Sequence, residues 1–289
     1  MNRRDFLTLA AVGGGAVFAS ALPGMARAAG KDFYFVQLSD SHWGYQGPAN
    51  PDARITLPKA VAAVNALEQP PAFIVFTGDL THTTDDPAER RRRMSEFKSI
   101  TAELKVRDIH YLAGEHDASL DHGEAFHELF GPSWYAFDHQ GVHFVAIDNV
   151  SDPGARVDDA QLDWLRADLA KLAAGTSVVV LTHRPLFDLA PNWGWATRNG
   201  QAVVDILLPY PNVTVFYGHI HQELHHQTGH ITHHSARSLI FPLPAPGSQD
   251  KRTPLPWDPA MPYRGLGFRG IAKADADSWQ IHEYPVVRT

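Results

Sequence analysis

Residues 33–42 read FYFVQLSDSH, an apolar run that ends abruptly in serine, aspartate and histidine. The arrangement returns four more times along the chain, as AFIVFTGD (72–79), IHYLAGEHD (109–117), SVVVLTH (177–183) and VTVFYGHIH (213–221). Continuous apolar runs of this length are typical of strands that are buried on both faces of a sheet. The sequence therefore predicts strands over residues 33–38, 72–77, 109–113, 177–182 and 213–217.

Helical patterns lie between these runs, over residues 58–69, 87–106, 159–174 and roughly 199–208. A hairpin is expected midway, with strands over 134–138 and 142–148 around a short polar turn. Because strands and helices alternate along the chain, we expect an α/β fold. No internal repeat or domain boundary interrupts the pattern.

Each of the five apolar runs ends in a cluster of glycine, aspartate, glutamate or histidine. In a largely parallel sheet these ends lie along one edge, where ligands of open α/β folds bind. One such residue would be an ordinary turn residue, but five successive clusters are hard to explain as turns. Two divalent ions about 3.5–4 Å apart need a bridging carboxylate, terminal imidazoles and open positions for substrate and water. Aspartate and histidine suit manganese, iron or zinc, so we expect two such ions here.

The composition agrees with a metal site of imidazole and carboxylate. The 289 residues include 17 histidines and no cysteine, which excludes disulfides, iron–sulfur clusters and thiol catalysis. The formal net charge of -7 gives no indication of binding to a nucleic-acid polymer or a membrane surface.

The ordered clusters resemble the calcineurin-like metallophosphoesterases. The five blocks of that family read Asp-x-His, Gly-Asp, Gly-Asn-His-Asp/Glu, His and Gly-His-x-His, and they occur here in that order across residues 40–221. The resemblance covers most of residues 32–235. It implies a four-layer αββα sandwich with two central mixed sheets and the metal site at the C-terminal edge of the strands. It also implies a phosphodiesterase or nucleotide phosphatase that uses a metal-bound hydroxide as its nucleophile.

The resemblance implies a role for each residue of these blocks. The first metal would be held by Asp40, His42 and His221, Asp79 would bridge, and the second metal would be held by Glu115, His183 and His219. His116 would be the general acid at the leaving oxygen, with Asp117 orienting its ring.

Glu115 departs from the family pattern, which has a neutral asparagine at this position. With Asp40 and Asp79 it supplies three negative charges, so two divalent cations leave a net charge of +1 instead of +2. We expect the extra charge to raise the pKa of metal-bound water and to weaken attraction for an anionic phosphate. Two alternatives are a trivalent ion such as Fe(III) in the second site, or a glutamate too long to ligate, which leaves a single-metal or non-catalytic site.

Candidate substrate contacts follow the fourth strand. Arg184 directly follows His183 and is a candidate phosphate contact, while Trp193 and Trp195 lie in the next loop. We expect these aromatic rings to wall the cleft and to stack on a flat group such as a nucleobase. The alternative is that they only shield the loops from water. The proline-rich segment 241–267 is long enough to be a functional loop or lid.

The N-terminal segment resembles a twin-arginine export signal. Residues 2–7 read NRRDFL, a glycine-containing apolar stretch runs to Leu22, and residues 26–28 offer a small-x-small cleavage site. We therefore expect a signal peptide over 1–28 and a metallophosphoesterase domain over 29–289. The partner would be the twin-arginine export machinery, the location would be the periplasm, and the stretch is too short for a stable membrane anchor. Cleavage would remove three arginines and one aspartate and take the net charge from -7 to -9.

Two functions follow from these expectations. The first is a periplasmic dinuclear hydrolase of small-molecule phosphoric esters, with a diester or nucleotide preferred over a protein phosphate. The second is a periplasmic metal-binding protein on the same fold with little or no turnover, which Glu115 and the surplus of histidine would explain.

Overall fold

A computed structural model describes residues 33–275 and 278–286 of the chain. One sheet contains β1 (Tyr34–Leu38), β2 (Ile74–Thr77), β3 (Ile109–Leu112), β10 (Gly267–Lys273) and β11 (Trp279–Pro285). The other contains β4 (Tyr135–His139), β5 (Val142–Ala146), β6 (Ser177–Leu181), β7 (Val213–Tyr217), β8 (Leu224–Thr228) and β9 (Ile231–Ser235). The helices are α1 (Ala53–Asn65), α2 (Pro87–Thr101), α3 (Glu115–Ala118), α4 (Glu124–Phe130), α5 (Asp159–Leu169) and α6 (Gly200–Leu207), with a 3₁₀ turn at Pro191–Trp193.

Both sheets are mixed. In the first sheet, with the order β11-β10-β1-β2-β3, the strands β1, β2 and β3 are parallel, while β10 and β11 run antiparallel to their neighbours. In the second sheet, with the order β4-β5-β6-β7-β9-β8, four central strands are parallel and both edge strands are antiparallel. The five polar clusters follow the carboxyl ends of parallel strands, namely β1, β2, β3, β6 and β7. The parallel strands β5 and β9 are not followed by one of these clusters.

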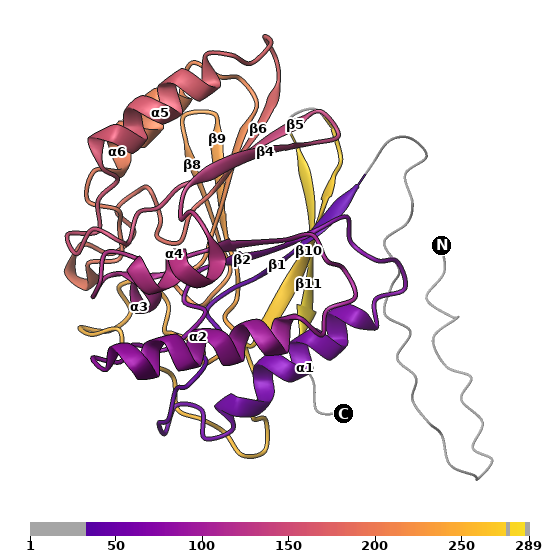
Figure 1. Ribbon diagram of the computed structural model, residues 1–289, viewed down its shortest axis with the longest axis vertical. Coiled ribbons are helices and arrows are strands. Elements are labelled where there is room, and N and C mark those ends of the chain that lie inside the picture. The colour runs from indigo at the N-terminus through magenta and orange to yellow at the C-terminus, as the bar shows by residue number, and fades with distance from the viewer. Residues whose placement is uncertain (1–32, 276–277, 287–289) are drawn as a thin grey trace, which may run out of the picture.

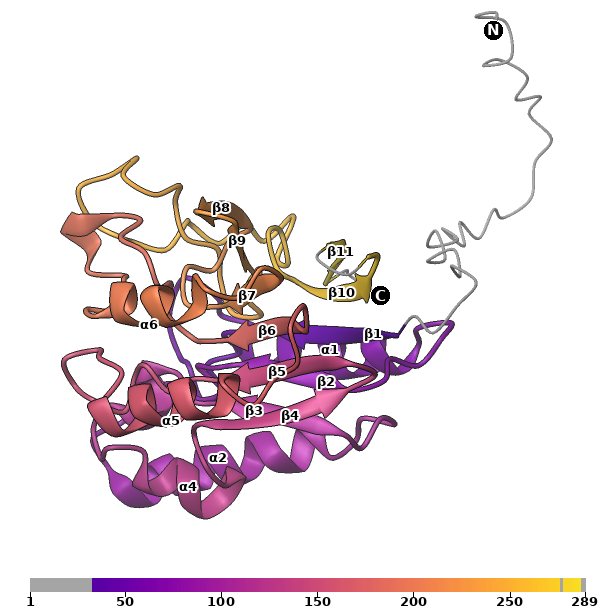
Figure 2. The ribbon, with the colours of Figure 1, turned by 90° about the horizontal axis from the view of Figure 1, so that it is seen from above.

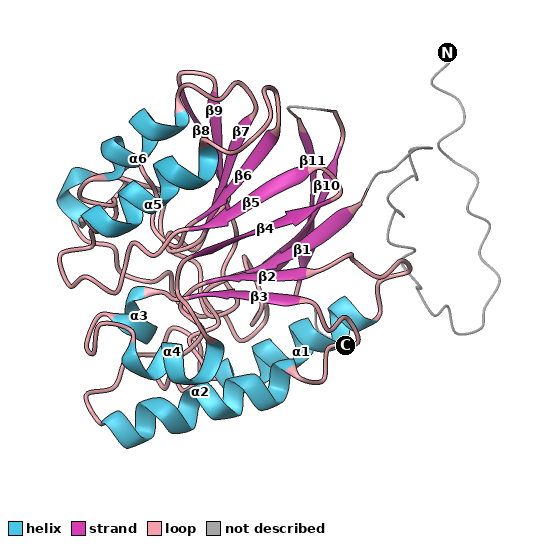
Figure 3. Ribbon diagram, turned by 45° about the horizontal axis from the view of Figure 1, so that its top comes forward, coloured by secondary structure: helices cyan, strands magenta, loops and turns pink. Residues whose placement is uncertain are grey.

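The two sheets pack face to face, and helices cover their outer surfaces (Figure 1). Helices α1, α2 and α4 lie against the first sheet and α5 and α6 against the second, as Figures 2 and 3 show. This confirms the predicted four-layer sandwich.

The layers explain why the strands are apolar throughout. In β6, Val178 and Val180 pack in the cluster under α5 and α6, whereas Val179 and Leu181 pack in the cluster between the sheets. Phe35 of β1 joins that central cluster from the opposite sheet. Because successive side chains of a strand point to opposite faces, a strand between two covered faces is apolar at every position.

The helix boundaries differ from the predicted ones. Helix α1 begins at Ala53 and contains Pro58, the residue at which the sequence pattern placed its start. Helices α2 and α5 end at Thr101 and Leu169, before the predicted ends. Their starts are as expected, since Asp158 caps α5 by accepting a hydrogen bond from the backbone N–H of Gln161 at 2.7 Å. Within the described residues, no helix has the length and apolar character to cross a membrane.

Candidate metal centre

Five strand ends meet at one edge of the sandwich. β1, β2 and β3 are neighbours in one sheet and β6 and β7 in the other, so the residues that follow them approach from both sheets. Three groups of side chains there have ligand atoms within 4.8 Å of one another and could hold a metal ion. The first group is Asp40, His42 and His221, the second is Asp79, Glu115, His183 and His219, and a third, of histidines alone, shares His42 with the first and adds His82 and His116. The structure therefore brings together all seven side chains that the sequence singled out as candidate ligands.

The backbone at this edge adopts an uncommon conformation. Of the eight non-glycine residues with a positive φ in the described chain, five are candidate ligands: Asp40 (54°), His42 (42°), Asp79 (49°), His219 (66°) and His221 (55°). Such conformations cost roughly 1–3 kcal/mol each and persist only where the surroundings hold them. Each of these five residues lies in the sharp turn that follows a strand, so the strained turns keep the ligand side chains at the edge.

Two glycines allow the loops of the site to approach one another closely. A Cβ at Gly114 would lie 2.1 Å from Oδ1 of Asp79. A Cβ at Gly218 would lie 2.1 Å from Oγ of Ser39 and 2.8 Å from Oδ2 of Asp40. Since no real side chain tolerates such contacts, only glycine fits at both positions.

Asp79 lies between the two groups. Its Oδ2 is 3.4 Å from Nε2 of His42 in the first group and 3.3 Å from Nε2 of His183 in the second. Its Oδ1 accepts a hydrogen bond from the backbone N–H of His116 at 2.9 Å. One carboxylate oxygen therefore faces both groups, which is the placement that a bridging ligand requires.

Backbone carbonyls orient two of the histidine rings. Nδ1 of His183 is 2.7 Å from the carbonyl oxygen of Thr77, and Nδ1 of His221 is 2.8 Å from that of Phe241. A carbonyl only accepts, so the Nδ1–H donates in both cases and Nε2 of each neutral ring keeps a free lone pair. This is the usual way in which a protein orients a metal-binding histidine.

The second group contains buried polar atoms without a hydrogen-bond partner. These atoms are Oε2 of Glu115, Nε2 of His183 and Nε2 of His219. Nε2 of His183 and Oε2 of Glu115 lie only 2.9 Å apart, although both are acceptors when the ring is neutral. Buried acceptors that face one another need a cation between them, so this donor set fits a metal ion.

The carboxylates of the second group ionise in spite of burial. Burial raises the pKa of Glu115, but the rings of His219 and His183 outweigh it and hold the pKa well below its ordinary value. The pKa of Asp79 is also lowered, because the neighbouring histidines outweigh burial and the charge of Glu115. For His183, burial lowers the pKa, but Asp79 and Glu115 raise it well above its ordinary value.

Glu115, at the start of α3, reaches the second group. Its Oε1 is 2.9 Å from Nδ1 of His219, and its Oε2 is 2.9 Å from Nε2 of His183. The carboxylate of Glu115 therefore lies within the cluster in spite of its additional methylene group. Oε1 also lies 3.7 Å from Nη1 of Arg184.

Thr83 positions the ring of His116. The backbone N–H of Thr83 points at Nδ1 of His116 at 3.3 Å, and the Thr83 hydroxyl contacts the same nitrogen. Nδ1 therefore accepts, and the neutral ring carries its proton on Nε2. The prediction that Asp117 orients this ring is wrong.

Asp117 instead binds backbone amides. Its Oδ2 accepts from the N–H groups of Leu80 and Gly114, both at 2.9 Å, and its Oδ1 accepts from the N–H and hydroxyl of Thr81 at 2.8 and 2.9 Å. These bonds tie the loop after β2 to the start of α3, so Asp117 places His116 through the backbone. Burial, followed by the charge of Asp79, raises the pKa of Asp117 to about 6.

His82 and Thr83 are the members of this neighbourhood that the sequence did not single out as site residues. The ring of His82 stacks on that of His116 at 5.0 Å, and its Nδ1 is 3.3 Å from Nδ1 of His42. Their sequence signal is position alone, since they follow Asp79 by three and four residues.

Comparison with known proteins agrees with this geometry. Residues 33–223 match Metallophos, the family described as calcineurin-like phosphoesterase. The chain belongs to the calcineurin-like phosphoesterase family. The resemblance found in the sequence is thereby confirmed, and the protein is a phosphoesterase.

The phosphoesterase resembles several named proteins. It is 31% identical over 231 residues to the 3',5'-cyclic adenosine monophosphate phosphodiesterase CpdA of Pseudomonas aeruginosa, over 74% of this chain and 79% of that protein. It is 28% identical over 185 residues to the serine/threonine-protein phosphatase CPPED1 of Danio rerio, over 55% of this chain and 59% of that protein. A dimetal phosphatase from Danio rerio has the same fold, with a TM-score of 0.60 at 16% identity over 88% of this chain and 96% of that one.

A cleft of about 190 Å³ opens over the two ligand groups of the phosphoesterase. Besides candidate ligands and His82, it is lined by His116, Phe241, Leu243, Arg252 and Pro254. His116 therefore faces the same space as the candidate ligands. The apolar side of the cleft and its one arginine come from the segment after β9, far along the chain from the ligand motifs.

Arg184 does not line this cleft. It is buried, and its Nη2 donates to the backbone carbonyls of Gly194 and Ala196. The exposed Arg252 takes the place at the cleft that the sequence suggested for Arg184.

Trp193 and Trp195 are also placed away from the cleft. Both are buried, their rings lie 4.6 Å apart edge to face, and the indole N–H of Trp193 donates to the carbonyl of Gln249. They pack with Tyr217 and Ile220 in a cluster beneath the loops. This placement favours the alternative of loop shielding over stacking on a substrate.

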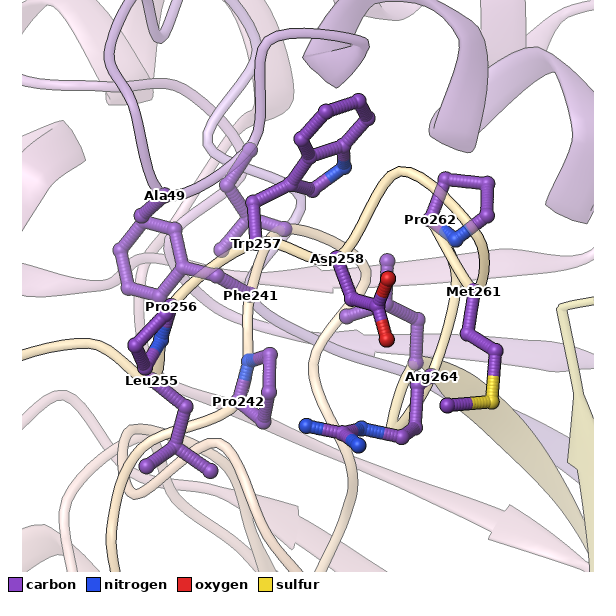
Figure 4. A pocket seen from close by; sticks show the side chains of 12 residues that line it. Ala49, Phe241, Pro242, Leu255, Pro256, Trp257, Asp258, Met261, Pro262 and Arg264 are labelled. Carbon is purple, nitrogen blue, oxygen red and sulfur yellow. The ribbon is translucent and has the colours of Figure 1, made fainter.

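The proline-rich segment 241–267 is fixed to the site at its start. The backbone carbonyl of Phe241 accepts from His221, as described, and also from the hydroxyl of Ser238 at 2.6 Å. Phe241 also lines a second pocket, together with other residues of this segment that include Trp257 and Arg264 (Figure 4). Its volume of about 20 Å³ has room for little more than one water molecule, so the larger cleft is the candidate substrate site.

Proposed function

We propose that this phosphoesterase hydrolyses phosphodiesters of small molecules, nucleotides among them, with two divalent cations in the seven-residue site. The observation that carries the proposal is the position of Asp79, whose Oδ2 lies within 3.4 Å of a histidine from each ligand group. A relative that is named a cyclic AMP phosphodiesterase, 31% identical over most of both chains, supports a nucleotide diester as the substrate class.

The two ligand groups divide the cations between them. Asp40, His42 and His221 would hold one, Glu115, His183 and His219 would hold the other, and Asp79 would contact both. Manganese, iron and zinc all suit this mixture of imidazole and carboxylate. When bound, such cations lower the pKa of water and polarise phosphoryl oxygens.

His116 supplies the proton for the leaving oxygen. Its Nδ1 accepts from the backbone N–H of Thr83, so Nε2–H is available to donate in the cleft. Thr83 fixes the ring, and Asp117 fixes the turn on which His116 lies.

The cleft favours a small substrate. Arg252 can bind an anionic oxygen at the cleft, while Phe241 and Leu243 offer apolar surface to the remainder of the substrate. A volume of about 190 Å³ suits part of a nucleotide better than a folded protein surface.

A substrate panel tests this proposal. Metal-free protein is reloaded with manganese, iron or zinc and assayed with 3',5'-cyclic AMP, bis(p-nitrophenyl) phosphate, p-nitrophenyl phosphate and a phosphoserine peptide. We expect the diesters to be hydrolysed fastest. Preference for the phosphopeptide would contradict the substrate class. Two bound cations without hydrolysis of any ester would instead identify the protein as the metal-binding alternative.

We also propose that the protein is exported to the periplasm by the twin-arginine route, on the basis of residues 1–28, which lie outside the described residues. Fractionation of cells that express the full chain is compared with a variant in which Arg3 and Arg4 are both lysine. We expect the native protein in the periplasm and the variant in the cytoplasm. Equal distribution of the two would contradict the proposal.

A further inference from the structure

The charge of Glu115 has a counterpart in the structure. Two divalent cations and the three carboxylates of the site leave one positive charge fewer than a site with a neutral amide at position 115. Arg184, whose Nη1 is 3.7 Å from Oε1 of Glu115, carries one positive charge. Among the described residues, Glu115 is the only acid within 4 Å of this guanidinium.

Arg184 is held in place from its other side. Nη2 donates to the carbonyls of Gly194 and Ala196, and Nε is buried without a hydrogen-bond partner. A guanidinium stays charged in proteins, and a buried charge requires an opposite charge nearby. The side chain is only 9% exposed, so it is not a free surface group that binds whatever enters the cleft.

The contacts of Glu115 show how the pair acts on the site. Oε1 lies near Nη1 of Arg184 and Nδ1 of His219, at 3.7 and 2.9 Å. Oε2 has no hydrogen-bond partner and faces Nε2 of His183. Arg184 and His219 thus hold one oxygen and leave the other for a cation.

We propose that Arg184 is a positioning residue that neutralises Glu115, so that the Glu115–Arg184 pair replaces a neutral amide ligand. This inference rests on the proposed two-cation site. It explains Glu115 without a trivalent ion, because the site with two divalent cations and Arg184 has the net charge that an asparagine would give. It also assigns to Arg184 a role towards Glu115 instead of towards the phosphate.

A double-mutant cycle on cation binding tests the pair. Mn²⁺ is titrated into metal-free native protein, Arg184→Gln, Glu115→Asn and the double variant. Of the two Mn²⁺ ions, the one with the lower affinity reports on the pair. We expect Arg184→Gln to bind this ion roughly tenfold more tightly, because a repelling charge is lost. We expect Glu115→Asn to bind it roughly tenfold more weakly, because an attracting charge is lost. The double variant should lie within about threefold of the native protein, because the two changes of net charge offset each other.

The pH dependence of hydrolysis gives a second readout. Arg184→Gln should move the acid limb of the pH–rate profile upward by about one unit, because the net charge at the cations falls, and the double variant should return it. Arg184→Lys keeps the charge and loses the planar fork, so it should retain the native midpoint and cation affinity. Arg198→Gln, an exposed arginine on the same loop, is the matched control and should change neither.

Three results would overturn the pairing. They are a double variant that binds Mn²⁺ as weakly as Glu115→Asn alone, a glutamine variant that behaves as the lysine variant does, and a native protein whose second site takes only a trivalent ion. Absence of hydrolysis by every protein in the series would count against the proposed function alone, because the cation affinities still decide the pairing. If Arg184→Gln does not fold by circular dichroism, Glu115→Asn with Arg184→Lys completes the cycle, and there the expected weakening by Glu115→Asn should persist.

Discussion

Two regions of this molecule are rich in histidine, and only one of them resembles a metal centre. At the strand ends, the histidine rings lie close to carboxylates. On the hairpin of β8 and β9, histidines face one another, since His225 is opposite His234 and His226 is opposite His233. His226 stacks on Phe187 at 3.7 Å. Within the described residues, no group that could hold a metal includes a hairpin histidine.

The difference shows what makes histidine a ligand. At the site, a backbone carbonyl fixes Nδ1 of His183 and a carboxylate lies opposite its Nε2. His233 is equally buried, but neither of its ring nitrogens has a partner, and burial, followed by the charges of His226 and His234, lowers its pKa to about 3. A ring of this kind stays neutral and acts as a packing group. Carboxylate neighbours and a fixed tautomer, more than histidine content, define the metal site.

The largest expected effect separates these two regions directly. Asp79→Asn removes the oxygen that faces both ligand groups, so we expect diester hydrolysis to fall roughly a thousandfold and at least one cation to be lost. The hairpin variant His226→Asn should keep full metal content and activity. Metal content by elemental analysis and initial rates check both. A metal-depleted His226→Asn protein would mean that the hairpin also binds metal.

The next largest effect separates proton transfer from metal binding inside the site. His116→Asn removes the proposed proton donor but none of the seven candidate ligands, so kcat should fall roughly 10²–10⁴-fold with unchanged metal content. His122→Asn is the matched control, because His122 has a positive φ, which asparagine tolerates. Loss of metal in His116→Asn would assign that ring to the ligand set instead.

Cation affinity should depend on pH through His183. Asp79 and Glu115 raise the pKa of this ring well above its ordinary value against the effect of burial, so we expect the metal-free protein to hold a proton there at neutral pH. A cation must displace that proton, and its apparent affinity should therefore rise with pH, by up to about tenfold per unit below the raised pKa. Calorimetric titration of Mn²⁺ at pH 6, 7 and 8, in buffers of different ionisation enthalpy, measures affinity and proton release. A flat affinity without proton release would show that His183 is neutral in the metal-free site.

The smallest effect concerns the orientation of His116. Thr83→Val keeps the backbone N–H that points at Nδ1 and removes the hydroxyl, so kcat should fall by roughly tenfold while KM and metal content stay the same. Thr83→Ser should restore the rate. If the valine variant is as active as the native protein, the backbone contact alone holds the ring.

The local pattern of the sequence predicts the central strands and the candidate ligands well. Strands β1, β2, β3, β6 and β7 are each an apolar run followed by a turn, and the ligands lie within that same short stretch. β11 and α4 were missed, because β11 mixes polar and apolar residues at a sheet edge and α4 is a short helix between two glycines.

Contacts between distant segments explain the remaining differences. The ring of His116 is held by Thr83, which precedes it by 33 residues, and not by the adjacent Asp117. Side chains that are neighbours in sequence can point in opposite directions. The local sequence pattern therefore does not show which residue contacts the ring. The contact between Arg184 and Glu115 likewise depends on side-chain conformations that only the folded chain defines.

The most direct measurement is anomalous diffraction from crystals of the protein purified with its native metals. Two anomalous peaks about 3.5–4 Å apart should lie on either side of Oδ2 of Asp79, one among Asp40, His42 and His221 and the other among Glu115, His183 and His219. A single peak, or two peaks that Asp79 does not join, would contradict a dinuclear site.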